Sequence, residues 1–81
     1  MKTLPHKNAI YLDSTVLKMI NYDEDKHLLE ATFNNNRTYR YLKVSKAVWR
    51  DFLATIYAGA SAGAFINKQI KPYYKCIEIT G

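Results

Sequence analysis

Residues 27–42 read HLLEATFNNNRTYRYL, and they contain two short strand patterns separated by three consecutive asparagines. Apolar and polar side chains alternate between residues 27 and 33, so one face of this strand is apolar. The asparagines at 34–36 suit a hairpin turn, because Asn adopts the left-handed backbone conformation more readily than most residues. Residues 37–42 predict a second strand that pairs back on the first. This antiparallel hairpin is the centre of the fold that we expect.

Further strand patterns flank the hairpin on both sides. Residues 14–21 predict a strand that is joined to the hairpin by a polar turn at residues 22–26. Residues 74–80 alternate in the manner of a strand and predict a C-terminal edge strand. We therefore expect a β-meander of about three antiparallel strands, with a candidate fourth strand at its edge.

Between the hairpin and the C-terminal strand, apolar residues recur every three or four positions, whereas in the strands they recur every two. Ser45 is placed to cap a helix whose apolar side chains, at 48, 49, 52, 53, 56 and 57, form one stripe, and Gly59 suits its end. Ser61 is placed to cap a second helix, which Pro72 ends. These patterns predict an α+β fold in which two helices pack on a small antiparallel sheet.

Composition indicates a single small domain over residues 1–81, with a loose arm at residues 1–8. Apolar residues make up 48% of the chain and charged residues 23%, which is an ordinary globular balance. No apolar run is long enough for a membrane span, and the first residues lack the apolar segment of a signal peptide. We therefore expect a cytoplasmic protein without membrane contact. Cys76 is the only cysteine, which excludes an internal disulfide.

Basic residues outnumber acidic residues by 12 to 7, which gives a net charge of +5, and they fall in two stretches. The first stretch contains Arg37, Arg40, Lys43, Lys46 and Arg50, and the second contains Lys68, Lys71 and Lys75. Such clusters are typical of nucleic-acid contact surfaces. A solvated surface that keeps a protein soluble has the same composition, and on charge alone we favour that interpretation.

Tyr39 and Tyr41 share one face of their strand with Arg37 and Lys43, whereas Arg40 points to the opposite face. An exposed tyrosine pair flanked by cations would stack on unpaired bases, with a gain of about 1–3 kcal/mol per base. Alternatively, both rings pack beneath a helix with their hydroxyls at the rim. We favour the packed arrangement, because a small sheet needs large side chains to bury one face.

The start of the second helix is a candidate anion site. Ser61 opens the helix, Gly63 lets its first turn approach a ligand or another backbone closely, and the free amide groups there attract phosphate. Asn67, Lys68 and Lys71 would extend the site along the helix. A capped helix whose small residues permit close packing accounts for the same residues equally well.

No combination of residues predicts catalysis or metal binding. His6, His27 and Cys76 are the only soft metal ligands, and their spacing fits no zinc signature. Neither Ser61 nor Cys76 has a base beside it in the sequence, as a nucleophile would need. We therefore expect a protein that is not an enzyme and that carries no cofactor and no metal.

Taken in order, these elements resemble the KTSC domain, a family found at the C-terminus of some lysyl-tRNA synthetases and as free-standing small bacterial or phage proteins. The resemblance covers roughly residues 14–74. It rests on Tyr22-Asp23, on the Tyr-Arg-Tyr motif at 39–41, and on the Ser-x-Gly-x-Phe-x-Asn motif at 61–67. The family often has Gly in the hairpin turn, where this chain has Asn35 or Asn36, and Pro after the Val, where this chain has Ser45. Asn still suits a turn and Ser still suits the start of a helix.

The resemblance implies an α+β fold and, through the association with a tRNA synthetase, RNA as a partner. We expect a small non-enzymatic module that binds RNA or another nucleic acid. The expected contact residues are Arg37, Tyr39, Arg40, Tyr41, Lys43, Ser61, Gly63, Asn67, Lys68 and Lys71. The alternative is a protein-interaction module acting on a host partner. It would use an apolar patch drawn from Tyr57, Phe65, Tyr73 and Tyr74, or a homodimer paired through the edge strand at 74–80.

Overall fold

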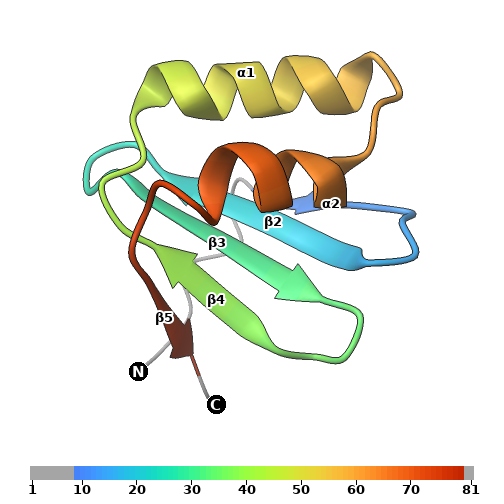
Figure 1. The fold of residues 1–81 in the computed structure, drawn as a ribbon, viewed down its shortest axis with the longest axis horizontal. Coiled ribbons are helices and arrows are strands. Elements are labelled where there is room, and N and C mark those ends of the chain that lie inside the picture. The colour runs from blue at the N-terminus through green and yellow to red at the C-terminus, as the bar shows by residue number, and fades with distance from the viewer. Residues whose placement is uncertain (1–8, 80–81) are drawn as a thin grey trace.

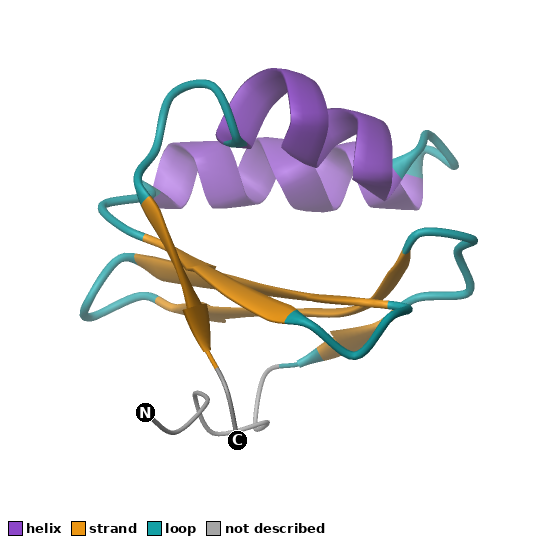
Figure 2. Cartoon of the chain, turned by 60° about the horizontal axis from the view of Figure 1, so that its bottom comes forward, coloured by secondary structure: helices purple, strands orange, loops and turns teal. Residues whose placement is uncertain are grey.

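The computed structural model describes residues 9–79 as one antiparallel sheet with helices on one face (Figures 1 and 2). Its strands follow chain order across the sheet: β1 (Ile10–Tyr11), β2 (Leu17–Asp23), β3 (Leu28–Phe33), β4 (Thr38–Tyr41) and β5 (Cys76–Ile79). The helices are α1 (Lys46–Tyr57), α2 (Ala62–Phe65) and the π-helix η2 (Ile66–Ile70), which continues α2. The predicted α+β meander is confirmed, with the edge strand β5 and the additional short strand β1. The arm expected at residues 1–8 lies outside the described residues.

The central hairpin forms around the asparagine turn. Leu29 on β3 pairs with Tyr41 on β4. Asn36 has a φ of 66°, and its N–H donates a hydrogen bond of 2.9 Å to the Phe33 carbonyl, which closes the turn. The left-handed conformation expected of the asparagines therefore falls on Asn36, and it fixes which residues of the two strands face one another.

The predicted helix caps are confirmed. The Ser45 hydroxyl accepts a hydrogen bond from the Val48 N–H at 3.4 Å, and the Ser61 hydroxyl accepts one from the Ala64 N–H at 3.1 Å. Gly59 follows the end of α1 with a φ of 82°, a left-handed conformation in which glycine carries no steric cost. The connection between α1 and α2 is therefore short and its two ends are fixed.

Aromatic side chains fix the helices on the sheet. Trp49 of α1 stacks on Tyr22 of β2 with ring centroids 5.0 Å apart, and Phe52 stacks on Phe65 of α2 at 4.7 Å. The Tyr22 hydroxyl donates to the Val44 carbonyl in the loop before α1. Burial, followed by nearby acidic charge, raises the pKa of Tyr22, so its phenol remains a neutral donor.

The face of the sheet opposite the helices contains a buried ion pair. Arg40 donates from Nε and Nη2 to Glu30 Oε2 at 2.9 and 2.7 Å, and the Glu30 side chain is only 1% exposed. The hydroxyls of Thr32 and Thr38 form a hydrogen bond of 2.9 Å between the same two strands. The pairing therefore offsets the cost of burying the Glu30 carboxylate on this face, because a lone buried charge would be strongly unfavourable.

We predict that Arg40→Ala lowers the free energy of unfolding, measured by urea denaturation, by about 3–5 kcal/mol, because it leaves the Glu30 carboxylate buried without its cation. Glu30→Leu/Arg40→Leu should recover most of that loss, since it removes both charges together. The matched control is Arg37→Ala, whose ion pair with Glu78 is exposed and spans 4.0 Å, and it should cost far less. Equal losses for Arg40→Ala and Arg37→Ala would contradict the prediction.

Candidate functional site

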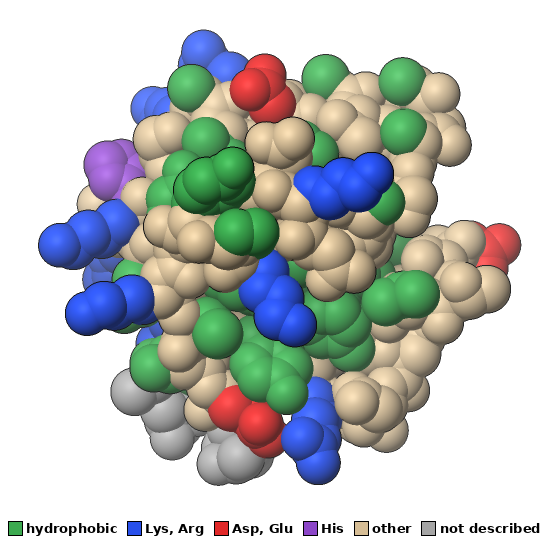
Figure 3. Space-filling view, in the orientation of Figure 1, with side chains coloured by type: hydrophobic (Ala, Val, Ile, Leu, Met, Phe, Trp, Pro, Cys, Tyr) green, Lys and Arg blue, Asp and Glu red, His purple; other side chains and the backbone are tan. Residues whose placement is uncertain are grey.

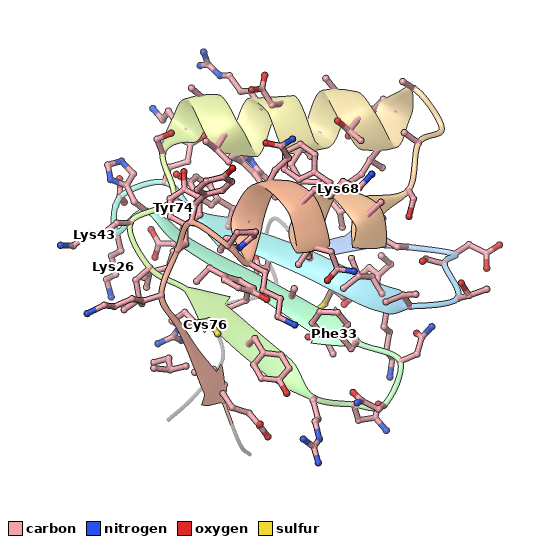
Figure 4. All side chains as sticks on the ribbon, viewed as in Figure 1. Lys26, Phe33, Lys43, Lys68, Tyr74 and Cys76 are labelled. Atoms are coloured by element: carbon pink, nitrogen blue, oxygen red, sulfur yellow. The ribbon has the colours of Figure 1, made fainter. Side chains whose placement is uncertain are left out.

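A groove of about 290 Å³ lies between η2 and the part of the sheet formed by β4 and β5. The sheet contributes Phe33, Tyr39, Tyr41 and Cys76, the hairpin turn contributes Asn35, and the helix contributes Ile66, Asn67 and Lys71. Figure 4 shows Phe33 and Cys76 below the helix, on either side of β4. Four residues singled out in the sequence, at positions 39, 41, 67 and 71, therefore meet in one groove.

The two tyrosines of the motif differ in their surroundings. Tyr41 is 3% exposed and belongs to the core, and burial is the main cause that raises its pKa. It forms the floor of the groove and offers no free ring face, as the packed arrangement required. Tyr39 is half-buried, and its ring meets Phe33 edge to face at 5.7 Å. Tyr39 is therefore the ring of the pair that a ligand in the groove can reach.

The π-helix sets which side chains face the groove. The Lys71 N–H donates to the Ile66 carbonyl at 2.7 Å, which is the i to i+5 spacing of a π-turn. Ile66 and Ile70 stay in the core, while Asn67 and Lys71 are exposed and line the groove. Lys68 is exposed and does not line the groove. Segments of π-helix are frequent at functional sites, and apolar periodicity did not reveal this one.

The start of α2 lies apart from this groove. Ser61 borders a second hollow of about 380 Å³, beside the end of α1 and the segment before β2. Gly63 is buried against Val16, and a Cβ added to Gly63 would lie 3.4 Å from the Val16 side chain. Gly63 therefore serves helix packing. Ser61 and Gly63 share a helix with Asn67 and Lys71 but do not share a groove with them.

The two arginines of the motif region have different partners. Arg37 lies beside the groove, and a hydrogen bond with Tyr39, followed by the charge of Glu78, raises the pKa of Arg37. Arg40 lies on the opposite face of the sheet, where Glu30 holds it, so it does not reach the groove. The sequence grouped both arginines with the phosphate contacts, and the structure separates them.

The groove also contains residues that sequence reasoning missed. Phe33, Asn35 and Cys76 were not candidates, although the hairpin register places Phe33 diagonally across from Tyr39. Cys76 is exposed and pairs with Tyr41 in the ladder of β4 and β5. Within residues 9–79 no three His, Cys, Asp or Glu side chains are grouped to hold a metal ion. No helix in that range is long and apolar enough to cross a membrane.

Comparison with known proteins places the chain in a family. A protein from Tsukamurella paurometabola is 28% identical over 68 residues, which cover 84% of this chain and 96% of that protein. The crystal structure of a KTSC domain protein from Yersinia pestis superposes with a TM-score of 0.79 at 29% identity, covering 90% of this chain and 97% of that one. The family model of the KTSC domain matches residues 13–74. The chain therefore belongs to the KTSC domain family.

Proposed function

We propose that this KTSC domain is a non-enzymatic RNA-binding module whose groove holds one unpaired nucleotide. The observation that carries the proposal is the convergence of Tyr39, Asn35, Asn67 and Lys71 on one groove. An unpaired base requires a ring face to stack on and amide groups that bond its edges, and its phosphate requires a cation. The groove offers all three kinds of group within one hollow.

The size of the groove favours a single nucleotide. Its volume of about 290 Å³ lies just below the range for small-molecule sites, which is about 300–1,000 Å³. A base that stays stacked inside a duplex would not reach a half-buried ring, so the groove selects single strands. The net charge of +5 adds a general attraction for the strand, and that attraction weakens as salt rises.

One acidic residue beside the groove opposes an anionic ligand. Glu78 is the cross-strand partner of Tyr39, and its carboxylate lies 4.0 Å from the Arg37 guanidinium. The carboxylate repels phosphate and competes with it for Arg37. Glu78 should therefore weaken the affinity of the groove for RNA. The proposal then predicts that removing this carboxylate strengthens RNA binding.

Fluorescence anisotropy with a labelled single-stranded oligouridine tests the proposal. Tyr39→Leu keeps an apolar side chain against Phe33 but removes the stacking face, so we expect about tenfold weaker binding. Lys71→Gln should also weaken binding and reduce its salt dependence. The matched control is Arg50→Gln on the exposed surface of α1, which removes one charge away from the groove and should have a smaller effect. No binding to the wild-type protein at low salt would reject the proposal.

Replacing Glu78 should strengthen binding. Glu78→Gln removes the carboxylate beside the groove and releases Arg37 for phosphate, so we expect the same anisotropy assay to show several-fold tighter binding. Asp51→Asn, on the exposed surface of α1, removes one negative charge elsewhere and is the control. Equal gains in RNA affinity from the two variants would mean that affinity depends only on net charge. That result would contradict the assignment of the groove as the binding site.

A second candidate function is protein interaction through β5. This strand is last in the sheet order, so its outer edge has no strand neighbour within residues 9–79, and Ile77 is 38% exposed. Among the apolar residues expected to form a patch, Tyr57 and Tyr73 are exposed, whereas Phe65 and Tyr74 pack partly against the core. Two copies of β5 could pair across their free edges as an antiparallel homodimer.

Light scattering coupled to size-exclusion chromatography tests the second candidate over a concentration series. Pairing through β5 predicts a dimer that Ile77→Lys disrupts, because the substitution places a charge on the free edge strand. Tyr57→Lys, which changes an exposed ring on α1, is the control and should leave the dimer intact. A monomer at every concentration would remove this candidate.

A further inference from the structure

Three segments of the chain meet at the end of the sheet where β4 stops. The Leu42 N–H donates to the Lys75 carbonyl at 2.9 Å, and the Val44 N–H donates to the His27 carbonyl at 2.9 Å. Residues 42–44 therefore lie between the start of β5 and the turn that joins β2 to β3. Residues far apart in the sequence become neighbours on this surface.

Each of these segments exposes a lysine, and we call Lys26, Lys43 and Lys75 the basic end. Lys26 and Lys43 project to the same side of the molecule in Figure 4. Figure 3 shows Lys and Arg side chains gathered on that side of the surface. Lys43 also has a φ of 59°, so the chain bends sharply where β4 has ended. The basic end is a surface assembled by the fold, since its lysines come from three separate segments.

Neighbouring acids leave this surface positive. The Glu24 carboxylate lies 3.6 Å from the Lys46 ammonium, and the Asp23 carboxylate accepts the N–H groups of Asp25 and Lys26 at 2.9 and 3.1 Å. Asp23 keeps its charge when it accepts these amide hydrogen bonds, and Asp25 is exposed in the same turn, so the two carboxylates offset two of the three lysine charges and leave a net positive charge. Among residues 9–79, no carboxylate lies within 4.0 Å of the ammonium groups of the basic end. Its lysines are therefore available to an anion in solution.

The basic end begins where the groove ends. Lys75 directly precedes Cys76, which lines the groove, and Lys71 lines the groove four residues earlier. Lys43 is two residues beyond Tyr41, which forms the floor of the groove. A ligand that leaves the groove past Lys71 therefore meets the lysines of the basic end next.

We propose that the basic end binds the phosphodiester backbone of the RNA strand on one side of the nucleotide in the groove. This inference rests on the function proposed above and gives the strand a path, from Lys71 across Lys75 and Lys43 to Lys26. Lysine ammonium groups contact phosphates as point charges, and phosphate contacts carry no sequence information directly. The basic end therefore adds affinity and direction to the bound strand without adding sequence preference.

Two oligouridines, a trinucleotide and a nonanucleotide, separate the basic end from the groove. The wild-type protein should bind the nonanucleotide more tightly and with a steeper salt dependence. Lys43→Gln/Lys75→Gln should weaken binding of the nonanucleotide and lower its slope of log K against log salt by about 1.4, because each phosphate contact on a single strand contributes about 0.7. Binding of the trinucleotide should stay unchanged. The control, Lys18→Gln/Arg50→Gln, removes two charges outside the basic end and the groove and should change the slope much less.

The outcomes separate this inference from the proposed function. If Lys43→Gln/Lys75→Gln affects the nonanucleotide no more than the control does, while Tyr39→Leu weakens both oligouridines, the basic end is rejected and the groove stands. If the wild-type protein binds neither oligouridine at low salt, the proposed function and this inference fall together. Equal urea midpoints for the wild-type and variant proteins establish that each comparison is made between folded proteins.

Discussion

One face of a five-stranded sheet has to be covered by two short helical segments, and this constraint determines how the buried aromatic side chains pack. Trp49 of α1 stacks on Tyr22 of β2, and Phe52 of α1 stacks on Phe65 of α2, so these rings join the helices to the sheet and to each other. Fewer helical residues lie over β4 and β5, where η2 forms the helical layer. A hollow forms at this margin, since a chain of 81 residues has few further side chains to fill it. The groove is therefore a consequence of the small size of the domain.

The Tyr39-Arg40-Tyr41 motif shows how one short stretch serves both faces of the sheet. Tyr41 is in the core and forms the floor of the groove, and Tyr39 forms part of its wall. Arg40, between them, points to the other face and pairs with the buried Glu30. The same strand register that pairs Arg40 with Glu30 places Tyr39 opposite Ala31, so one strand pairing sets the geometry of both faces. The motif is therefore a structural unit as well as a source of candidate contacts.

Much of the fold could be predicted from the sequence, because the strongest local signals agree with the tertiary structure. The asparagine turn and the two serine caps act through backbone hydrogen bonds of nearby residues, and short-range patterns record such bonds well. The strand β1 has only two residues, which leaves no periodicity to detect. The π-turn keeps Ile66 and Ile70 buried, as an α-helix would, so the apolar pattern could not reveal it.

The candidate site was less predictable, because it depends on which segments meet in space. Asn67 and Lys71 belong with Tyr39, whereas Ser61, on the same helical segment, borders a different hollow. Proximity in sequence along a helix was a poor guide to the site. The pairing of Arg40 with Glu30, by contrast, follows from the hairpin register and was within reach of the sequence. The contribution of Cys76 required knowing that β5 lies beside β4.

Cys76 permits the most direct measurement of whether RNA occupies the groove. It is the only cysteine in the chain, it is exposed, and it lines the groove. We would measure the rate at which iodoacetamide alkylates Cys76 with and without a saturating short oligouridine, by mass spectrometry. Occupancy of the groove predicts several-fold slower alkylation in the presence of RNA. An unchanged rate, under conditions where anisotropy shows the RNA to be bound, would contradict the assignment of the groove as the binding site.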